Sequence, residues 1–146
     1  MYRRAVCPRV TDRVEDGLRI ARLLSSELVA REDGPLAALE LDDVRDADAL
    51  DPGEFGAFAY GVAVDGDRLA DVYVHDDRAR VEFRRGVEAV PGAAAGEAGL
   101  RARPKAVEPP RALVFVGDGA AVKRALDVVA AALAAAEDGG AADAGD

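Results

Sequence analysis

The sequence predicts an α+β fold, in which one antiparallel sheet of about five to six strands is covered by an N-terminal and a C-terminal helix. Three patterns support it: a helical apolar stripe near the start, alternating apolar residues in the middle, and an alanine-rich helical segment near the end. The expected element order is α-β-β-β-β-α-β-β-α. We expect a single domain over residues 1–137 and a disordered acidic tail over residues 138–146.

The first helix is expected to begin at Asp12, which can cap it, while Glu15 completes a capping box. Gly34 is expected to end this helix. A short strand from about Leu36 to Leu41 and an acidic loop are expected to follow. Apolar residues recur along the helix at spacings of three and four, as one stripe formed by Val14, Leu18, Ala21, Leu24 and Leu28.

Three segments in the middle of the chain alternate apolar and other residues: "AFAYGVAV", "LADVYVH" and "ARVEFRR". A period of two is typical of antiparallel strands that bury one face and expose the other. A four-residue loop "DDRA" between the second and third segments would place Val74 opposite Val81 and Asp71 opposite Arg84. Asp71, His75 and Arg80 would then lie on the solvent face.

The remaining elements are less regular. Residues 87–98 allow a short helix, but a proline and two glycines weaken it, so the sequence leaves this segment open. Residues 100–110 are expected to be extended, with prolines suited to a sheet edge. "ALVFV" indicates a buried central strand, and the helix after it carries one apolar side formed by Val122, Leu126, Val129 and Leu133.

This element order resembles that of type III secretion chaperones and related small α+β domains. The resemblance covers the order of elements alone, so no functional residue follows from it.

The charge composition predicts the solvent in which the protein works. The net charge is −9, from 28 acidic and 19 basic residues, and only two of the basic residues are lysine. Abundant aspartate and scarce lysine are typical of halophiles, where surface carboxylates keep proteins soluble in molar salt. Acidic charge also argues against general affinity for nucleic acid, because phosphate repels it.

Cys7 is the only cysteine, so no internal disulfide is possible. The first residues lack the uninterrupted apolar stretch of a signal peptide, and no segment has the length of a transmembrane helix. We therefore expect a cytoplasmic protein with no membrane partner. Nothing in the sequence indicates a cofactor.

His75, followed by Asp76 and Asp77, is the only histidine and the best candidate for metal binding or acid–base chemistry. Consecutive strand residues point to opposite faces, so these side chains do not converge within a strand. A second histidine or nearby cysteine ligand is lacking, and aspartates are common in tight turns. The hairpin interpretation therefore accounts for all three residues, and we predict neither a metal ligand nor a catalytic residue.

The turn "GDGAAVK" from Gly117 to Lys123 lies between a strand and a helix, where helix N-termini bind phosphate. It lacks the glycine that precedes the lysine in phosphate loops, and Val122 occupies the third glycine position of the dinucleotide pattern. Asp118 would repel phosphate and is well suited to cap the helix.

The segment from residue 78 to residue 111 reverses the acidic bias, because it holds eight basic residues and four acidic ones. Arg80 and Arg84 share the predicted solvent face, and Arg101 and Arg103 alternate in the same way. These arginines either pair with the protein's own carboxylates or form a contact surface for an acidic partner or another anion. The candidate binding residues are Arg80, Arg84, Arg101, Arg103 and Lys105.

The sequence thus favours a small, non-catalytic interaction or regulatory protein that associates with a protein partner or with itself. Self-association is expected through the alanine-rich helix. The alternative is a module that binds an anion or nucleic acid through the arginine strands, with nucleic acid the less favoured ligand. A small enzyme that uses His75 is the third alternative.

Overall fold

The computed structural model describes residues 17–30, 34, 36–46, 50–51, 56–97, 100–107 and 109–145. Of residues 138–145 it describes only the course of the backbone. Asp12, Val14 and Glu15, the expected start of the first helix, lie outside the described residues. Among the described helices, none is both long and apolar enough to cross a membrane.

Six strands form one antiparallel sheet in the order β1-β2-β3-β4-β6-β5. This arrangement confirms the predicted α+β fold and its element order. The strands are β1 (Leu39–Asp42), β2 (Ala57–Val64), β3 (Asp67–Val74), β4 (Ala79–Phe83), β5 (Arg101–Lys105) and β6 (Arg111–Val116). The helical elements are α2 (Gly17–Val29), the 3-10 turn η2 (Val87–Ala89), α3 (Val90–Ala95) and α4 (Gly119–Gly145).

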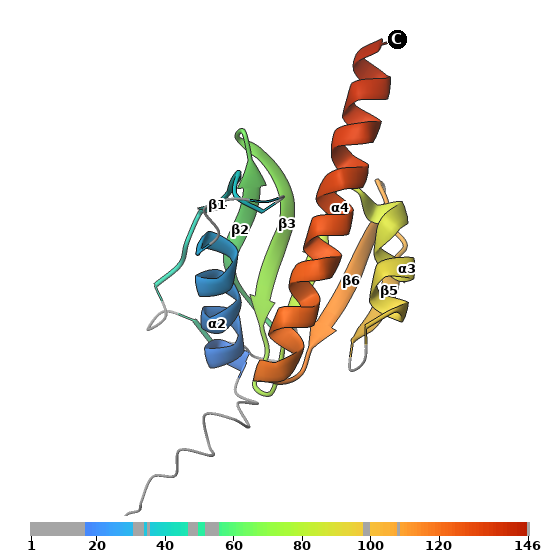
Figure 1. The fold of residues 1–146 in the computed structure, drawn as a ribbon. Helices are drawn as coiled ribbons and strands as arrows, with labels where there is room; N and C mark the ends of the chain where they lie inside the picture. The colour runs from blue at the N-terminus through green and yellow to red at the C-terminus, as the bar shows by residue number, and fades with distance from the viewer. Residues whose placement is uncertain are drawn as a thin grey trace, which may run out of the picture.

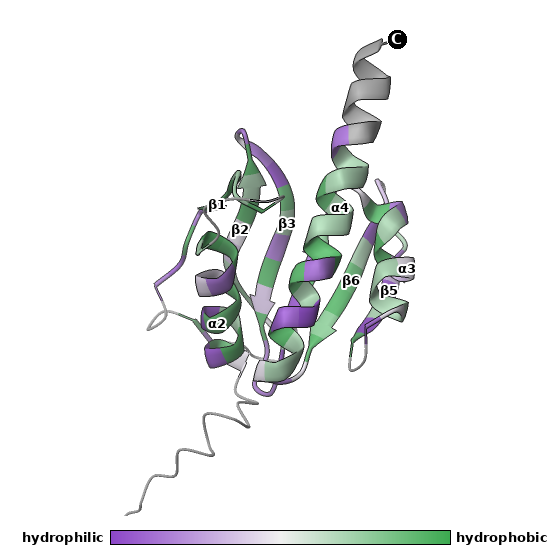
Figure 2. Ribbon diagram, viewed as in Figure 1, coloured by the Kyte–Doolittle hydropathy of each residue, from purple (hydrophilic) through white to green (hydrophobic). Residues whose placement is uncertain are grey.

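The three α-helices among the described residues lie on one face of the sheet and bury it (Figure 1). Helix α2 supplies an apolar stripe whose polar opposite side is visible in the hydropathy colouring (Figure 2). Most of the predicted stripe is buried, and Ile20 joins it, whereas Leu18 is only partly buried. The largest fully buried apolar side chains are Phe83, Ile20, Leu24, Leu28, Leu69 and Leu133.

The β3–β4 hairpin differs from its predicted register by two residues. Val72 is opposite Val81, and Val74 is opposite Ala79, so the loop spans residues 75–78 rather than 76–79. The His75 amide donates a hydrogen bond of 2.8 Å to the Arg78 carbonyl and closes this loop. A two-residue shift keeps every side chain on its predicted face, because the side-chain period of a strand is two.

Strand β5 forms one edge of the sheet, as its prolines predicted, and Pro104 lies opposite Ala112 of β6. Strand β6 separates β5 from β4, so it is internal, as expected. Its exposure nevertheless alternates, since only one of its two faces lies against the helices.

The last helix is capped as predicted. Asp118 Oδ1 accepts a 2.8 Å hydrogen bond from the Ala121 amide. The backbone of α4 then continues to Gly145, past the sheet (Figure 1). The disorder that the sequence predicts for residues 138–146 stays a prediction.

Candidate functional site

The face of the sheet that no described helix covers, here called the open face, is unusually rich in cations. Residues of all six strands lie on the open face, as strand alternation and register show. Two carboxylates, Asp71 and Glu82, lie near its centre as cross-strand neighbours. Around them and toward the β5 edge lie seven cationic side chains: Arg68, Arg80, Arg84, Arg101, Arg103, Lys105 and Arg111.

Asp71 and Glu82 are almost fully buried, with 4% and 1% of their surface exposed. From strand alternation we predicted that both side chains lie on a solvent-exposed face, and the predicted exposure was wrong. Long arginine and lysine side chains lie over the sheet and cover them, as such side chains often cover nearby surface. Burying two adjacent carboxylates is unfavourable unless cations surround them.

The cations do surround them. Arg68 Nη1 lies 2.6 Å from Asp71 Oδ1, and Arg84 Nε lies 3.5 Å from Asp71 Oδ2. Glu82 Oε1 accepts hydrogen bonds from Arg111 at 2.7 Å and Lys105 at 2.9 Å. Burial raises the pKa of Glu82, but the hydrogen bonds from Lys105 and Arg111 outweigh it and hold the pKa below its usual value.

A glycine makes room for one of these cations. Gly61 is the cross-strand neighbour of Asp71, and a Cβ added to it would overlap the Arg68 guanidinium. Without that Cβ, Arg68 lies across the sheet and also reaches Asp42 Oδ2 on β1 at 3.1 Å. The guanidinium thereby bridges two strands that are not neighbours.

Arg80 also turns inward. Its guanidinium stacks over the Tyr73 ring at 4.3 Å, its Nη1 is 3.2 Å from His75 Nε2, and its Nε is 3.8 Å from Glu82 Oε2. A guanidinium only donates hydrogen bonds, so His75 Nε2 accepts, and the imidazole is neutral with its proton on Nδ1. Burial and then Arg80 and Arg78 lower the pKa of His75.

His75 is therefore not the exposed hairpin residue that the sequence predicted, because only 8% of its surface is exposed. Its ring lies against Gly56, where a Cβ would come within 2.9 Å of Nε2. The described residues include no group of three or more His, Cys, Asp or Glu side chains that could hold a metal ion. His75 has a structural role here: it orients Arg80.

Replacing His75 with alanine is expected to lower the free energy of unfolding by about 1.5 kcal/mol at pH 8, because Arg80 loses an acceptor and the ring's packing is lost. The folded-state pKa is depressed, so this contribution is present above the usual value of 6.5 and is lost as pH falls through the folded pKa. Urea unfolding at pH 8 and pH 5.5 measures both effects. Asp77→Ala in the same loop, where the side chain is 74% exposed, is the control. If His75→Ala lowered the free energy of unfolding by less than about 0.5 kcal/mol, His75 would behave as an ordinary surface residue, and the structural role would be contradicted.

Arg101 and Arg103 behave differently from the other arginines of the open face. Both are exposed, and neither forms an ion pair with any residue in the described part of the chain. Together with Arg78 and Phe115 they line a hollow of about 450 Å³. Arg78 stacks over the Phe115 ring at 5.4 Å and is 2.9 Å from the exposed Asp77.

The structure thus divides the five predicted binding residues into two groups. Arg80, Arg84 and Lys105 pair with the protein's own Asp71 and Glu82. Arg101 and Arg103 project from the β5 edge into the hollow, and Arg78, which the sequence placed in the basic segment but not in the site, completes it. Register explains this addition, because Phe115 lies between Arg80 and Arg101 on neighbouring strands.

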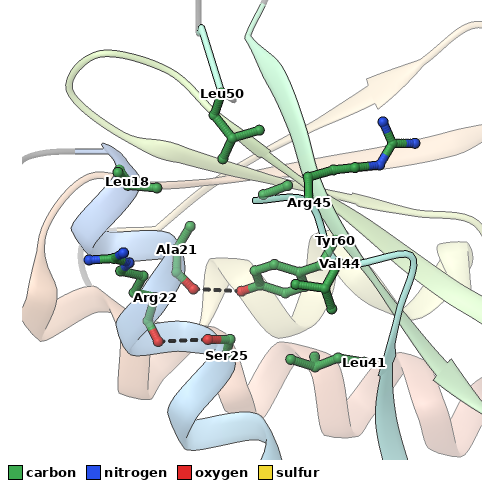
Figure 3. Close-up of a pocket in the computed structure, with 10 residues that line it drawn as sticks. Leu18, Ala21, Arg22, Ser25, Leu41, Val44, Arg45, Leu50 and Tyr60 are labelled. Carbon is green, nitrogen blue, oxygen red and sulfur yellow. Dashed lines mark hydrogen bonds between the residues drawn. The ribbon is translucent and has the colours of Figure 1, made fainter. Parts of the chain in front are cut away.

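A second, apolar hollow of about 140 Å³ lies between α2, β1 and β2 (Figure 3). Its lining includes Leu18, Leu41 and Leu50. The buried Tyr60 hydroxyl donates a 2.7 Å hydrogen bond to the Ala21 carbonyl, and burial raises the pKa of Tyr60. This hydrogen bond fixes β2 to α2, which gives Tyr60 a structural role.

The family model of a family of unknown function, DUF7993, matches residues 9–146. The chain belongs to this family. No curated protein and no solved structure matches the chain. The DUF7993 region contains every described element, so both the open face and the hollow of Arg78, Arg101 and Arg103 lie within it.

Proposed function

We propose that this DUF7993 member is a non-catalytic binding protein whose open face takes up carboxylate groups of a protein partner through Arg78, Arg101 and Arg103. One observation carries the proposal: Arg101 and Arg103 lie in the hollow and pair with no carboxylate among the described residues, although the chain has a net charge of −9. The neighbouring Arg84, Arg111 and Lys105 each have such a carboxylate.

Arginine suits this role because its planar guanidinium binds a carboxylate through two parallel hydrogen bonds. Such contacts act at short range, so they persist in salt that screens charges beyond about 3 Å at 1 M. Binding to a nucleic-acid backbone instead depends on long-range attraction and counterion release, and it weakens steeply with salt. In concentrated salt, short-range contacts to a protein carboxylate are therefore favoured over binding to a nucleic-acid backbone.

The proposal is tested with a hexaglutamate peptide as the probe, by titration calorimetry on the full chain. Replacing both Arg101 and Arg103 with glutamine is expected to weaken binding at least about tenfold, since each charge-assisted hydrogen bond contributes about 1.5–3 kcal/mol. Thermal stability is expected to change little, because both side chains are exposed.

The matched control is Lys123→Gln with Arg124→Gln, which removes two positive charges from α4, on the other side of the sheet. This control is expected to change the peptide affinity less than about twofold, because only the long-range field differs. Equal losses in the two double variants would contradict a specific site. No measurable binding of the peptide by the wild-type chain, at a concentration where sedimentation shows it to be monomeric, would contradict the proposed function itself.

A further inference from the structure

The open face carries opposite charges at its two edges. Strand β1 forms one edge, where the inward-facing Leu39 and Leu41 alternate with Glu40 and Asp42 on the open face. Strand β5 forms the other edge, with Arg101 and Arg103. Four strands separate the acidic edge from the basic edge.

The groups at the two edges are accessible. Glu40 is exposed and forms no ion pair with any residue that the structure describes. The Asp42 side chain is 53% exposed and uses one carboxylate oxygen for Arg68. At the other edge, Arg101 and Arg103 face the hollow and likewise have no such pair.

A twofold axis parallel to the strands and above the middle of the open face would bring these edges together. A rotation of 180° about this axis places the second sheet face down on the first and reverses the order of its strands. Strand β1 of each copy then lies across from β5 of the other. By register, Asp42 is level with Arg103 and Glu40 is level with Lys105, so the acidic edge of each copy would approach the basic edge of the other, at two symmetric places. Interfaces of this isologous kind are the commonest in symmetric oligomers.

The centre of the face is compatible with this packing. Asp71 and Glu82 offset much of the positive charge there. Two central guanidinium groups lie over aromatic rings instead of projecting outward: Arg80 over Tyr73 at 4.3 Å and Arg68 over Phe58 at 5.7 Å. Stacked, weakly hydrated guanidinium planes are well suited to interfaces.

From this arrangement we infer that the carboxylate partner is a second copy of this chain, bound face to face through the two edges. The inference rests on the proposed function, for which it names the partner. It differs from the sequence prediction of self-association through the alanine-rich helix, because the apolar side of α4 is buried in the protein's own core.

The size of the face indicates a reversible dimer. Six strands spaced about 4.8 Å apart make a face about 24 Å wide, and five residues per strand give about 17 Å of length. Two such faces bury about 800 Å² in total, which lies at the low end of protein–protein interfaces, among weak and transient ones. We expect a dissociation constant in the micromolar range, on the order of 10 μM.

A charge-exchange experiment tests the inference by sedimentation velocity on the full chain. One variant carries Arg101→Glu and Arg103→Glu, and the other carries Glu40→Arg. Each variant alone juxtaposes like charges at both contacts and is expected to be monomeric where the wild-type chain dimerises. An equimolar mixture of the two is expected to dimerise again, because one contact is then reversed and the other is wild type.

Three results would overturn the inference: a wild-type chain that is monomeric, a variant that dimerises on its own, or a mixture that stays monomeric although circular dichroism shows that both variants are folded. If the arginine-to-glutamate variant does not fold, Arg101→Gln with Arg103→Gln replaces it and is expected to weaken the dimer at least tenfold. Hexaglutamate binding distinguishes the two proposals. If the wild-type chain is monomeric but binds the peptide through Arg101 and Arg103, the proposed function stands and only the second copy as its partner is excluded.

Discussion

Replacing Glu82 with glutamine is expected to lower the free energy of unfolding by about 3 kcal/mol, because it leaves three partly buried cations without their counter-charge. Glu82 is 1% exposed and serves Lys105, Arg111 and Arg80 together. Glutamine keeps the shape of the side chain and one acceptor oxygen. The loss of stability therefore measures the effect of the charge rather than of the side-chain volume. Equilibrium urea unfolding at pH 7 measures it.

Glu88→Gln is the control, since Glu88 is exposed on η2, and its replacement is expected to stay within about 0.5 kcal/mol. The pKa of Glu82 is lowered in the folded state, so its contribution is full above the usual value of 4.5 and is lost as pH falls through the folded pKa. The difference between wild type and Glu82→Gln should therefore narrow below pH 4.5. A loss under about 1 kcal/mol at pH 7 would show that water reaches the network.

Replacing Gly86 with alanine is expected to cost about 3 kcal/mol for two separate reasons. Gly86 has a φ of 64°, a left-handed conformation that costs an L-residue about 1–2 kcal/mol. A Cβ there would also overlap the Ala132 carbonyl in the backbone of α4. The helix must move away from the sheet to admit it, and such overpacking costs about 1–3 kcal/mol.

Gly66→Ala separates these two causes. Gly66, in the β2–β3 turn, has a φ of 82°, and a Cβ there would meet nothing within 4 Å. It therefore suffers the backbone strain alone, and its expected cost is about 1 kcal/mol. Equal costs at the two glycines, measured by urea unfolding, would contradict the close approach of α4 to Gly86.

The fold was predictable because its strands repeat a simple pattern. Residues 70–74 and 79–83 alternate strictly enough to fix which face each side chain occupies. In β2 a bulge between Phe58 and Tyr60 places Phe58 on the open face opposite Tyr73, whereas strict alternation predicted that it shares the face of Tyr60. Alternation does not fix register, since a slip of two residues preserves the faces, and the β3–β4 pairing was therefore two residues wrong.

The candidate site was predictable in part. Alternation placed Arg80, Arg84, Arg101 and Arg103 on one face, and the structure shows them there. It did not show that Glu82 is buried, because its burial depends on long side chains from β4, β5 and β6 that meet above it. One signal was available: Glu82 is an isolated acid between two arginines on an internal strand, where an unpaired carboxylate is unfavourable.

Strand β5 also bears on how large any assembly can become. A bare sheet edge offers a row of hydrogen-bonding groups to a strand of another molecule, and repeated additions lead to filaments. Pro104 removes one donor from β5, and the charged residues Arg103 and Lys105 flank it. Edge-to-edge growth is thereby disfavoured, whereas pairing through faces about a twofold axis closes on itself after two molecules. The same strand that supplies the arginines would thus keep the protein in small, soluble units.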